Sequence, residues 1–457
     1  MAMPLSFAME SGLNQLALEQ TISEERNVSG QRSVRDALEI PDCESTLPAK
    51  DAGETAWDVA VIGAGPAGAL AARQLALRGL RTLLVDRNSF PREKVCGGCI
   101  SGLGRRLLER VGLTELLEPP SAAPLARFDL AAGGRRVSFE LPAGAAVSRL
   151  HFDVQLVRRA VSEGAAFLGG TPALVRGLAF GGRFRTLFLQ HEDQPVRVRA
   201  RIVIAADGLG RSSLKRHRAF ASQVAAESRI GLGATLSAAA SEVAPGCVLM
   251  SVAKDGYVGM VHVPGDALNI AAAVDPNLVR DQGPAEAVRA VLIQAGVEPP
   301  PGLASAEWRG TGLLTRQSPR HSARRLLVLG DAAGYVEPFT GEGMTWGMLS
   351  AMLSAPLLAS WLDRDSAGHC DCMAARQQFV RLAQEWSAFH HRHIAPRQRD
   401  CRVLAGLLRH PAAVGVAMTL ISFAPAVAKP LIRHFWNSGK DVDFAAQVGL
   451  PARHAMR

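Results

Sequence analysis

The strongest constraint on the fold is a glycine-rich turn between an apolar run and a helical pattern. The run WDVAVIG is short and apolar and ends at Gly63, which is typical of a buried strand in a parallel sheet. Gly63, Gly65 and Gly68 form the pattern G-x-G-x-x-G, and apolar residues at helical spacing follow it. The next apolar run, RTLLVD, ends at Asp86 and predicts a second strand. Residues 57–86 are therefore expected to form a βαβ unit.

Each glycine of this turn has a physical reason to lack a side chain. Gly63 permits the tight turn, Gly65 lets a pyrophosphate approach the backbone, and Gly68 lets the helix pack closely on the strand. The start of the helix offers unpaired N–H groups and the positive end of a dipole to the phosphates. The carboxylate of Asp86 can accept hydrogen bonds from both ribose hydroxyls of an adenosine, and its charge disfavours a 2′-phosphate. The sequence therefore predicts a dinucleotide ligand, NAD or FAD, rather than NADP.

Two later segments favour FAD over NAD. VIAADGLGRSSLKR ends a predicted strand at Asp207, and LLVLGDAAGYVEPFTGEGMTWG ends another at Gly330 and Asp331. The ribityl chain of a flavin needs an acceptor such as Asp331, and the edge of its ring needs a close backbone, which Gly341 and Gly343 permit. A helix that begins near Gly343 would also direct N–H groups at the negative charge of the reduced ring. A nicotinamide dehydrogenase needs neither segment.

The order of the patterns along the chain predicts the fold class. Short alternating stretches such as ARFDLAAGGRRVSFEL indicate antiparallel strands that interrupt the strand–turn units, and the end of the chain is mostly helical. The expected class is α/β, with a Rossmann-type FAD-binding domain, an inserted antiparallel substrate sheet and C-terminal helices. The predicted parts are a mobile N-terminal extension at 1–55, an FAD-binding part at 56–124, 149–222 and 320–362, an antiparallel substrate part at 125–148 and 223–319, and a C-terminal helical region at 363–457.

Composition narrows the partners and the compartment. The formal net charge is +9 and the isoelectric point about 9.6, but the arginines are scattered and no basic run is interleaved with aromatic residues. Nucleic-acid binding is therefore not expected. The chain has seven cysteines, an odd number, which points to a reducing compartment with the cytoplasm as the default.

One C-terminal run, residues 411–428, carries no charge. Its Gly415, Pro425, Thr419 and Ser422 disfavour a helix that spans a bilayer. A buried hairpin is one interpretation, and an apolar surface that contacts a membrane or a hydrophobic substrate is the other. Peripheral membrane contact through residues 411–432 therefore stays open.

The four motifs together resemble a known group of flavoenzymes. The order GAGPAG, PREKVCGG, ADGLGRSS and GDAAGYVEPFTGEGM is similar to the FAD-dependent oxidoreductases that include p-hydroxybenzoate hydroxylase-type aromatic hydroxylases, geranylgeranyl reductases and flavin halogenases. The similarity extends over residues 57–347 and more loosely into the C-terminal helices. It implies the fold and the cofactor, FAD, more strongly than it implies the reaction.

The resemblance also implies roles for single residues. Asp86 would hold the adenosine ribose, and Asp207 would support the pyrophosphate and the nicotinamide donor. Asp331 would hold the ribityl chain, and Arg149 matches an Arg-x-x-Phe-Asp-x-x-Leu helix start near the cofactor. The cofactor-binding residues expected from the motifs and the resemblance together are Gly63, Gly65, Pro66, Ala67, Gly68, Asp86, Arg87, Arg92, Lys94, Cys96, Gly97, Arg149, Asp207, Gly330, Asp331, Gly341, Gly343 and Met344.

The cysteine loop FPREKVCGGCIS leaves alternatives open. PREKVCGG resembles the P-R-x-K-x-C-G-G loop of the geranylgeranyl reductases. By that resemblance its glycines let the chain pass close to the flavin, and Cys96 is a candidate residue near the ring. Cys99 has no counterpart, so a disulfide between Cys96 and Cys99 stays possible. No metal site is expected, since a second CxxC is missing and the histidines at 390, 391 and 393 are interpreted as a solvated helix face.

The resemblance leaves the reaction between several types. The favoured interpretation is a monooxygenase that hydroxylates an aromatic or polyketide-like hydrophobic substrate through a flavin C4a-hydroperoxide, with no catalytic side chain nominated. The alternatives are a geranylgeranyl-reductase-type double-bond reductase and a non-catalytic FAD-binding or membrane-docking protein. GYVGMVHVP lacks the tryptophan of the reductases' Tyr-x-Trp-x-Phe-Pro strand, and the halogenases' Trp-x-Trp-x-Ile-Pro motif is absent. NAD(P)H is expected to bind transiently as electron donor, and an electron-donor protein is the other possibility.

Overall fold

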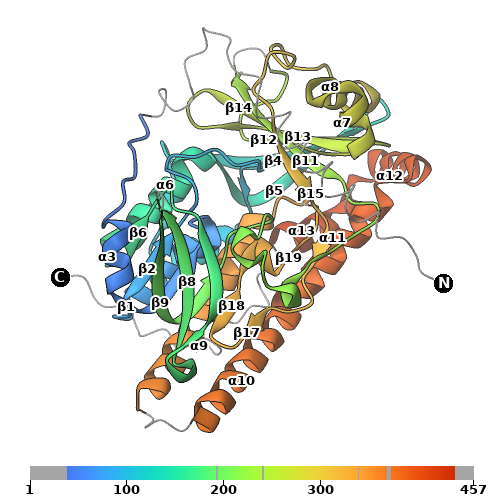
Figure 1. Ribbon diagram of the computed structural model, residues 1–457. Helices are drawn as coiled ribbons and strands as arrows, with labels where there is room; N and C mark the ends of the chain where they lie inside the picture. The colour runs from blue at the N-terminus through green and yellow to red at the C-terminus, as the bar shows by residue number, and fades with distance from the viewer. Residues whose placement is uncertain (1–38, 192–193, 239–240, 338, 368–371, 438–457) are drawn as a thin grey trace.

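Two large sheets and a long run of C-terminal helices make up the molecule (Figure 1). The computed structural model describes residues 39–437 except 192–193, 239–240, 338 and 368–371. The strands are β1 Ala56–Ile62, β2 Thr82–Val85, β3 Cys99–Ile100, β4 Ala122–Ala132, β5 Arg135–Val147, β6 Ala166–Leu168, β7 Ala173–Ala179, β8 Phe184–His191, β9 Gln194–Ala205, β10 Gln223–Val224, β11 Ile230–Ser237, β12 Cys247–Ala253, β13 Gly256–Val263, β14 Ala267–Val274, β15 Arg309–Leu313, β16 Arg316–Gln317, β17 Ser322–Ala323, β18 Leu326–Val328 and β19 Gly334–Tyr335. The helices are α3 Ala49–Glu54, α4 Pro66–Ala76, α5 Gly102–Arg110, α6 Arg149–Ser162, α7 Pro276–Gln282, α8 Pro284–Ala295, α9 Gly343–Ala367, α10 Cys372–Phe389, α11 Ala395–Leu407, α12 Pro411–Phe423 and α13 Lys429–Asn437, with a π-helical segment at His390–Ile394.

The first sheet has the strand order β17-β18-β9-β1-β2-β6, and β8 and β7 continue from β9 as an antiparallel extension. β1 pairs in parallel with both β2 and β9, and β18 pairs in parallel with β9. Val59, Ala60 and Val61 of β1 are fully buried because helices and a second layer cover the two faces of the sheet. The predicted α/β class and the βαβ unit are confirmed.

Helices α4, α6 and α9 pack on one face of this sheet, where Leu70, Phe152 and Met348 share one apolar core. On the other face lie α3 and the β7–β8 extension. This arrangement leaves the carboxyl ends of β1, β2, β9 and β18 as the edge where the connecting turns gather.

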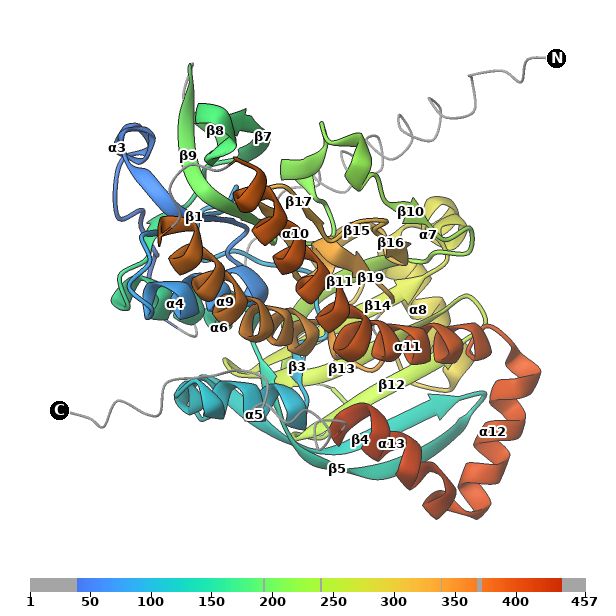
Figure 2. The same ribbon diagram turned by 90° about the horizontal axis from the view of Figure 1, so that it is seen from below.

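The second sheet has the strand order β15-β11-β14-β13-β12-β4-β5-β3. Its pairs are antiparallel, as predicted, apart from β12 and β4, which pair in parallel. Helix α8 packs on one face through Val288, Val291 and Leu292. On the other face, Met418 of α12 packs in a cluster with Tyr257 of β13 (Figure 2). The short strand β3 belongs to this sheet although residues 56–124 were assigned to the FAD-binding part.

The N-terminal boundary predicted from composition is wrong. Order begins before residue 56: Ile40 is 5% exposed, and Ala49 and Ala52 of α3 pack into the core on the β9 side of the first sheet. These three apolar residues stand in an otherwise polar sequence, so they form no apolar pattern that would predict a buried segment. Residues 1–38 of the predicted mobile extension lie outside the described residues.

The histidine cluster is a solvated face only at His391, which is exposed as predicted, whereas the prediction is wrong for the other two histidines. His390 and His393 are buried, and the ring of His390 lies 3.8 Å from that of His321, centroid to centroid. Burial lowers the pKa of His390 to about 3, so the ring is neutral at physiological pH. Among the residues that the structure describes, no three His, Cys, Asp or Glu side chains gather closely enough to hold a metal ion.

The C-terminal helices form a bent arm. Within the described ranges, no single helix is both long and apolar enough to cross a bilayer. Only the pair Arg376–Leu407 and Pro411–Phe423 meets that test together, and it is bent by 101°.

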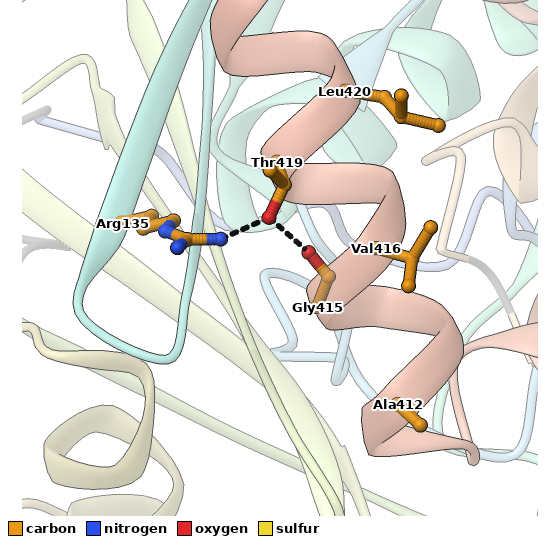
Figure 3. Close-up of a pocket in the computed structure, with 6 residues that line it drawn as sticks. All are labelled: Arg135, Ala412, Gly415, Val416, Thr419 and Leu420. Atoms are coloured by element: carbon orange, nitrogen blue, oxygen red, sulfur yellow. Dashed lines mark hydrogen bonds between the residues drawn. The ribbon is translucent and has the colours of Figure 1, made fainter.

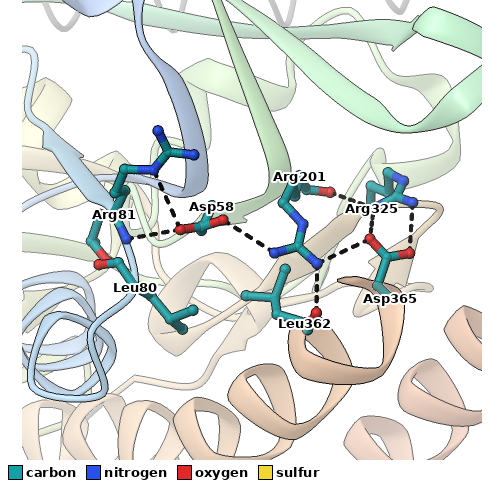
Figure 4. Close-up of polar contacts among 8 residues, drawn as sticks. Asp58, Leu80, Arg81, Arg201, Arg325, Leu362 and Asp365 are labelled. Atoms are coloured by element: carbon teal, nitrogen blue, oxygen red, sulfur yellow. Dashed lines mark hydrogen bonds and ion pairs between the residues drawn. The ribbon is translucent and has the colours of Figure 1, made fainter. Parts of the chain in front are cut away.

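A chain of ion pairs joins the first sheet to the end of α9 (Figure 4). Arg201 of β9 contacts Asp58 of β1 at 3.1 Å and Asp365 of α9 at 3.3 Å. Arg325, whose side chain is 5% exposed, contacts the same Asp365 carboxylate at 3.0 Å. Asp365 thus serves two largely buried guanidinium groups. Its removal leaves Arg201 paired with Asp58 alone and takes from Arg325 the carboxylate that compensates its charge.

Asp365→Ala is therefore expected to lower the free energy of unfolding by about 2–4 kcal/mol. Urea unfolding followed by circular dichroism measures this change. Glu286→Ala is the matched control, because the Glu286–Arg289 pair has side chains 48% and 51% exposed and its loss should cost below about 0.5 kcal/mol. Equal midpoints for the two variants would contradict the structural role of Asp365.

Candidate cofactor site

The glycine-rich turn lies at the carboxyl end of β1, where α4 begins at Pro66 with Gly65 as its N-cap. No side chain caps this helix start, so its first N–H groups remain available to a ligand. A Cβ atom at position 68 would lie 1.8 Å from the carbonyl oxygen of Gly63, which no real side chain can do. At Gly63, φ is +100° and a Cβ would lie 2.4 Å from the carbonyl oxygen of Ala206. Both positions therefore require glycine.

Asp86 ties this turn to the end of β2. Its Oδ2 accepts a hydrogen bond from the Ala64 N–H at 2.8 Å, and its Oδ1 accepts one from the Asn88 N–H at 2.9 Å. The Arg92 guanidinium lies 3.6 Å from the same carboxylate. Each carboxylate oxygen keeps a further lone pair, so the side chain can still accept from a ribose hydroxyl. Arg87, the next predicted residue, is exposed at the surface.

Two arginines lie over the turn. Arg149, the first residue of α6, donates to both oxygens of Asp153 at 2.8 and 2.6 Å, and Arg92 contacts Asp153 at 3.1 Å. A Cβ on Gly65 would lie 3.6 Å from Arg92 Nη2 and 3.9 Å from Arg149 Nη2. The absent side chain at Gly65 thus leaves space between a helix N-terminus and two guanidinium groups, an arrangement suited to a diphosphate.

Lys94 joins two further motifs to this group. A Cβ on Gly208 would lie 2.8 Å from Lys94 Nζ, so the lysine reaches the turn after β9. Burial lowers the pKa of Lys94, and the nearby Asp331 carboxylate opposes that shift. Burial likewise raises the pKa of Asp331, with Lys94 and Arg149 opposing it. Lys94 belongs to the cysteine loop, and it lies close to Gly208 after β9 and to Asp331 after β18. The ends of both strands therefore lie beside this loop.

Asp207 carries an unused acceptor. Its Oδ2 accepts from the Ser213 N–H at 2.7 Å and from the Ser212 hydroxyl at 3.3 Å. Its Oδ1 is buried and has no hydrogen-bond partner in the part of the chain that the structure describes. Burial raises the pKa of this carboxyl group. Such an orphaned oxygen fits a site that a polar ligand completes.

The second glycine pair stands at the start of α9. Gly341 has φ +71°, and a Cβ there would lie 3.4 Å from Cys99 Cβ, so this turn contacts the cysteine loop. A Cβ on Gly343 would lie 3.5 Å from the Tyr335 ring. The Met344 side chain is buried in the main core, so only its backbone, at the start of α9, is placed to contact a cofactor as predicted.

Gly330 and Ala67 connect the two ends of the site. A Cβ on Gly330, where φ is +58°, would lie 3.0 Å from Ala67 Cβ, and one on Gly347 would lie 3.4 Å from it. The turn after β18 and helix α9 therefore pack directly on α4.

The cysteine loop passes between the two sheets. Cys96 and Cys99 are both free thiols, so the disulfide that the sequence left open is not formed in the structure. Burial raises the pKa of Cys99 to about 12, which keeps it protonated. The Cys96 thiol lies beside the Arg149 guanidinium. Burial alone would lower the pKa of Arg149, but Asp153 and Cys96 raise it above its usual value.

Asn269 and Tyr335 belong to this region although no sequence pattern predicts a role for either of them. The Asn269 Nδ2 donates to the carbonyl oxygen of Cys96 at 2.9 Å and so holds the loop against β14 of the second sheet. A Cβ on Gly98 would lie 3.5 Å from the same Nδ2. No pattern marks a single asparagine in a strand so far along the chain, so only the fold could reveal this contact.

The gathered residues fit FAD. A side-chain-free turn, two guanidinium groups, a lysine, an orphaned carboxylate oxygen and a glycine-rich helix start come from separate motifs and lie together. Asp86 would hold the adenosine ribose, Arg92 and Arg149 the diphosphate, and Asp331 the ribityl chain. Pro66 and Ala67 supply the helix start, and Gly97 is a half-buried part of the loop beside it.

Comparisons with known proteins agree with this geometry. Digeranylgeranylglycerophospholipid reductase of Picrophilus torridus is 27% identical over 332 residues, which are 68% of this chain and 80% of the relative. Menaquinone reductase of Mycolicibacterium smegmatis is 26% identical over 449 residues, which cover 88% of this chain and 97% of the relative. The solved structure of OxyS anhydrotetracycline hydroxylase from Streptomyces rimosus shares the fold, with a TM-score of 0.61, 20% identity and coverage of 88% of this chain and 78% of that one.

The family model for the FAD binding domain matches residues 56–387, which include both sheets and nearly all of α10. The predicted resemblance is therefore confirmed, and FAD is the cofactor that the family and the site both support. The chain belongs to the FAD binding domain family of FAD-dependent oxidoreductases.

Proposed function

We propose that this enzyme reduces a carbon–carbon double bond in the isoprenoid chain of a lipid. The observation that carries the proposal is the position of the loop PREKVCGG, the reductase-like motif of the sequence, with Cys96 beside Arg149 at the cofactor site. The two relatives reported above are reductases named for a geranylgeranyl phospholipid and for menaquinone, and both of these are polyisoprenoid lipids.

FAD, when bound, supplies the two electrons that the double bond accepts. The start of α9 would direct N–H groups at the place where the second glycine pair leaves the backbone bare, and these would stabilise negative charge on a reduced ring. NAD(P)H is proposed as the electron donor that reduces the cofactor again. It would bind without a separate nucleotide-binding domain dedicated to it.

Cys96 is the proposed source of one proton. Its thiol is half-buried and lies beside the fixed positive charge of Arg149. A proton that leaves this thiol for substrate carbon would leave a thiolate next to the Arg149 guanidinium. With FAD bound, the reduced cofactor would supply the second hydrogen as hydride, so that the double bond would gain two hydrogens in total.

An apolar wall adjoins the site and suits an isoprenoid chain. Tyr335, which faces Gly343, packs against a cluster that contains Tyr257, Phe339 and Met250. Burial raises the pKa of both tyrosines well above the usual value, so they are neutral. The Tyr257 hydroxyl is buried and makes no hydrogen bond to any described residue, which leaves it available to a substrate headgroup or water.

Hydroxylation of an aromatic or polyketide-like substrate, favoured from sequence alone, is the alternative. Its support is the fold shared with the OxyS hydroxylase, a likeness that concerns architecture rather than chemistry. The two reactions differ in their need for oxygen, so one experiment separates them.

Asp331→Ala and Gly65→Val are each expected to weaken FAD binding at least about tenfold, because one removes a charged acceptor and the other fills the space beneath two guanidinium groups. The absorbance of bound flavin per chain after purification measures the loss. Asp281→Ala, at a carboxylate 62% exposed on α7, is the matched control and should keep full flavin content. Full flavin in both site variants, with unchanged thermal unfolding, would contradict the site.

Anaerobic incubation of the reduced enzyme with a detergent-solubilised geranylgeranyl lipid is expected to yield a product heavier by two hydrogens per double bond. Mass spectrometry detects the product. Cys96→Ala should lower the rate at least about tenfold while FAD remains bound, and Cys96→Ser should restore part of it. A product that instead gains one oxygen atom, and only in air, would overturn the proposal in favour of hydroxylation.

A further inference from the structure

Helix α12, Pro411–Phe423, has an unusual outer surface. It contains no charged residue, yet Val416 and Leu420 are each 61% exposed and Phe423 is 87% exposed. A surface helix of a globular protein normally turns polar residues outward. An uncharged helix with large apolar side chains in solvent therefore marks a contact surface rather than ordinary packing.

The helix is fixed to the body by its other side. Met418 is buried in the cluster that contains Tyr257, and Thr419 is hydrogen-bonded to Arg135 on β5. Figure 3 shows Ala412, Val416 and Leu420 in one row that points away from Arg135. The spacing of four residues places this row on a single face, so the exposed apolar surface is continuous along the helix.

The surroundings of the helix are basic. Residues 401–437 contain Arg402, Arg409, Lys429 and Arg433 and no aspartate or glutamate. Arg409 is ion-paired with Glu337 at 2.7 Å, so it adds little to the positive charge of this surface. Lys429 and Arg433 follow α12 and are exposed. An uncharged apolar face flanked by positive side chains matches the two layers of an anionic bilayer surface, hydrocarbon below and negative headgroups above.

We propose that α12 docks the enzyme onto a membrane that contains anionic phospholipid. Thirteen residues extend about 20 Å along the helix axis, short of the roughly 30 Å of a hydrocarbon core, so the helix lies in the interface with Val416, Leu420 and Phe423 inserted. A second copy of this chain fits the surface less well, because a two-fold contact would bring the exposed positive side chains of Lys429 and Arg433 close to their own copies. Figure 2 shows α12 at the outer edge of the molecule, where a flat surface can reach it.

The docking surface connects to the cofactor site through the protein interior. The buried side of α12 and the site residue Tyr335 contact the same apolar cluster, which includes Phe339 and Leu408. If the proposed function holds, this continuity indicates that the docked face is also the side from which a lipid substrate enters. Membrane binding itself needs no catalysis, so the two proposals fail independently.

Flotation of the full-length holoenzyme with vesicles tests the docking. Vesicles of phosphatidylcholine with phosphatidylglycerol should carry the enzyme upward, and pure phosphatidylcholine or high salt should carry much less. The double variant Leu420→Glu and Phe423→Glu should lower the ratio of bound to free enzyme at least about tenfold. The control variant Ile293→Glu, at a side chain 51% exposed on α8, should float like the wild type.

Three results would overturn the proposal. The wild type could fail to float with anionic vesicles, or the double variant could float as well as the control. Sedimentation velocity could show a dimer that Leu420→Glu and Phe423→Glu dissociate, which would assign the surface to a second copy. Flavin content and circular dichroism of each variant confirm that the protein tested is folded.

Discussion

The contact between Gly63 and Gly68 is the constraint on which the structure depends. The two backbones approach so closely that a Cβ at position 68 would overlap the Gly63 carbonyl oxygen at 1.8 Å. This approach sets the start of α4 directly against the carboxyl end of β1. Gly330 and Gly347 pack against Ala67 on the same turn of helix, where an added Cβ would lie 3.0 and 3.4 Å from the Ala67 Cβ, and this brings the end of β18 and helix α9 to the same edge. The site thus follows from close backbone packing before any polar group acts.

The polar groups then hold a loop that has no secondary structure of its own. Asp153 on α6 binds Arg92 and Arg149, Asp86 adds a further contact to Arg92, and Asn269 holds the Cys96 carbonyl from the second sheet. The loop is therefore fixed from both sheets at once. This places a thiol, a guanidinium group and the apolar cluster of the second sheet around one point, where the cofactor edge and a substrate would meet.

Much of this arrangement is predictable from sequence because it rests on glycine and on buried strands. The βαβ unit follows from the apolar run before Gly63, and the hairpin of β4 and β5 follows from alternation around two glycines. Residues 39–55 escape prediction because Ile40, Ala49 and Ala52 are too few to give a period. His390 is mispredicted since consecutive histidines suggest solvent, and Asn269 carries no local signal at all. Contacts between residues far apart in the sequence, such as that of Asn269 with Cys96, can be recognised only once the fold is known.

The central claim is that four separated turns hold one flavin adenine dinucleotide. The most direct measurement is heat release of the cofactor from protein purified without added flavin, followed by chromatography that separates FAD from FMN. The account predicts FAD, in a ratio approaching one per chain. A protein that carries FMN, or that binds no flavin when FAD is added, would contradict it.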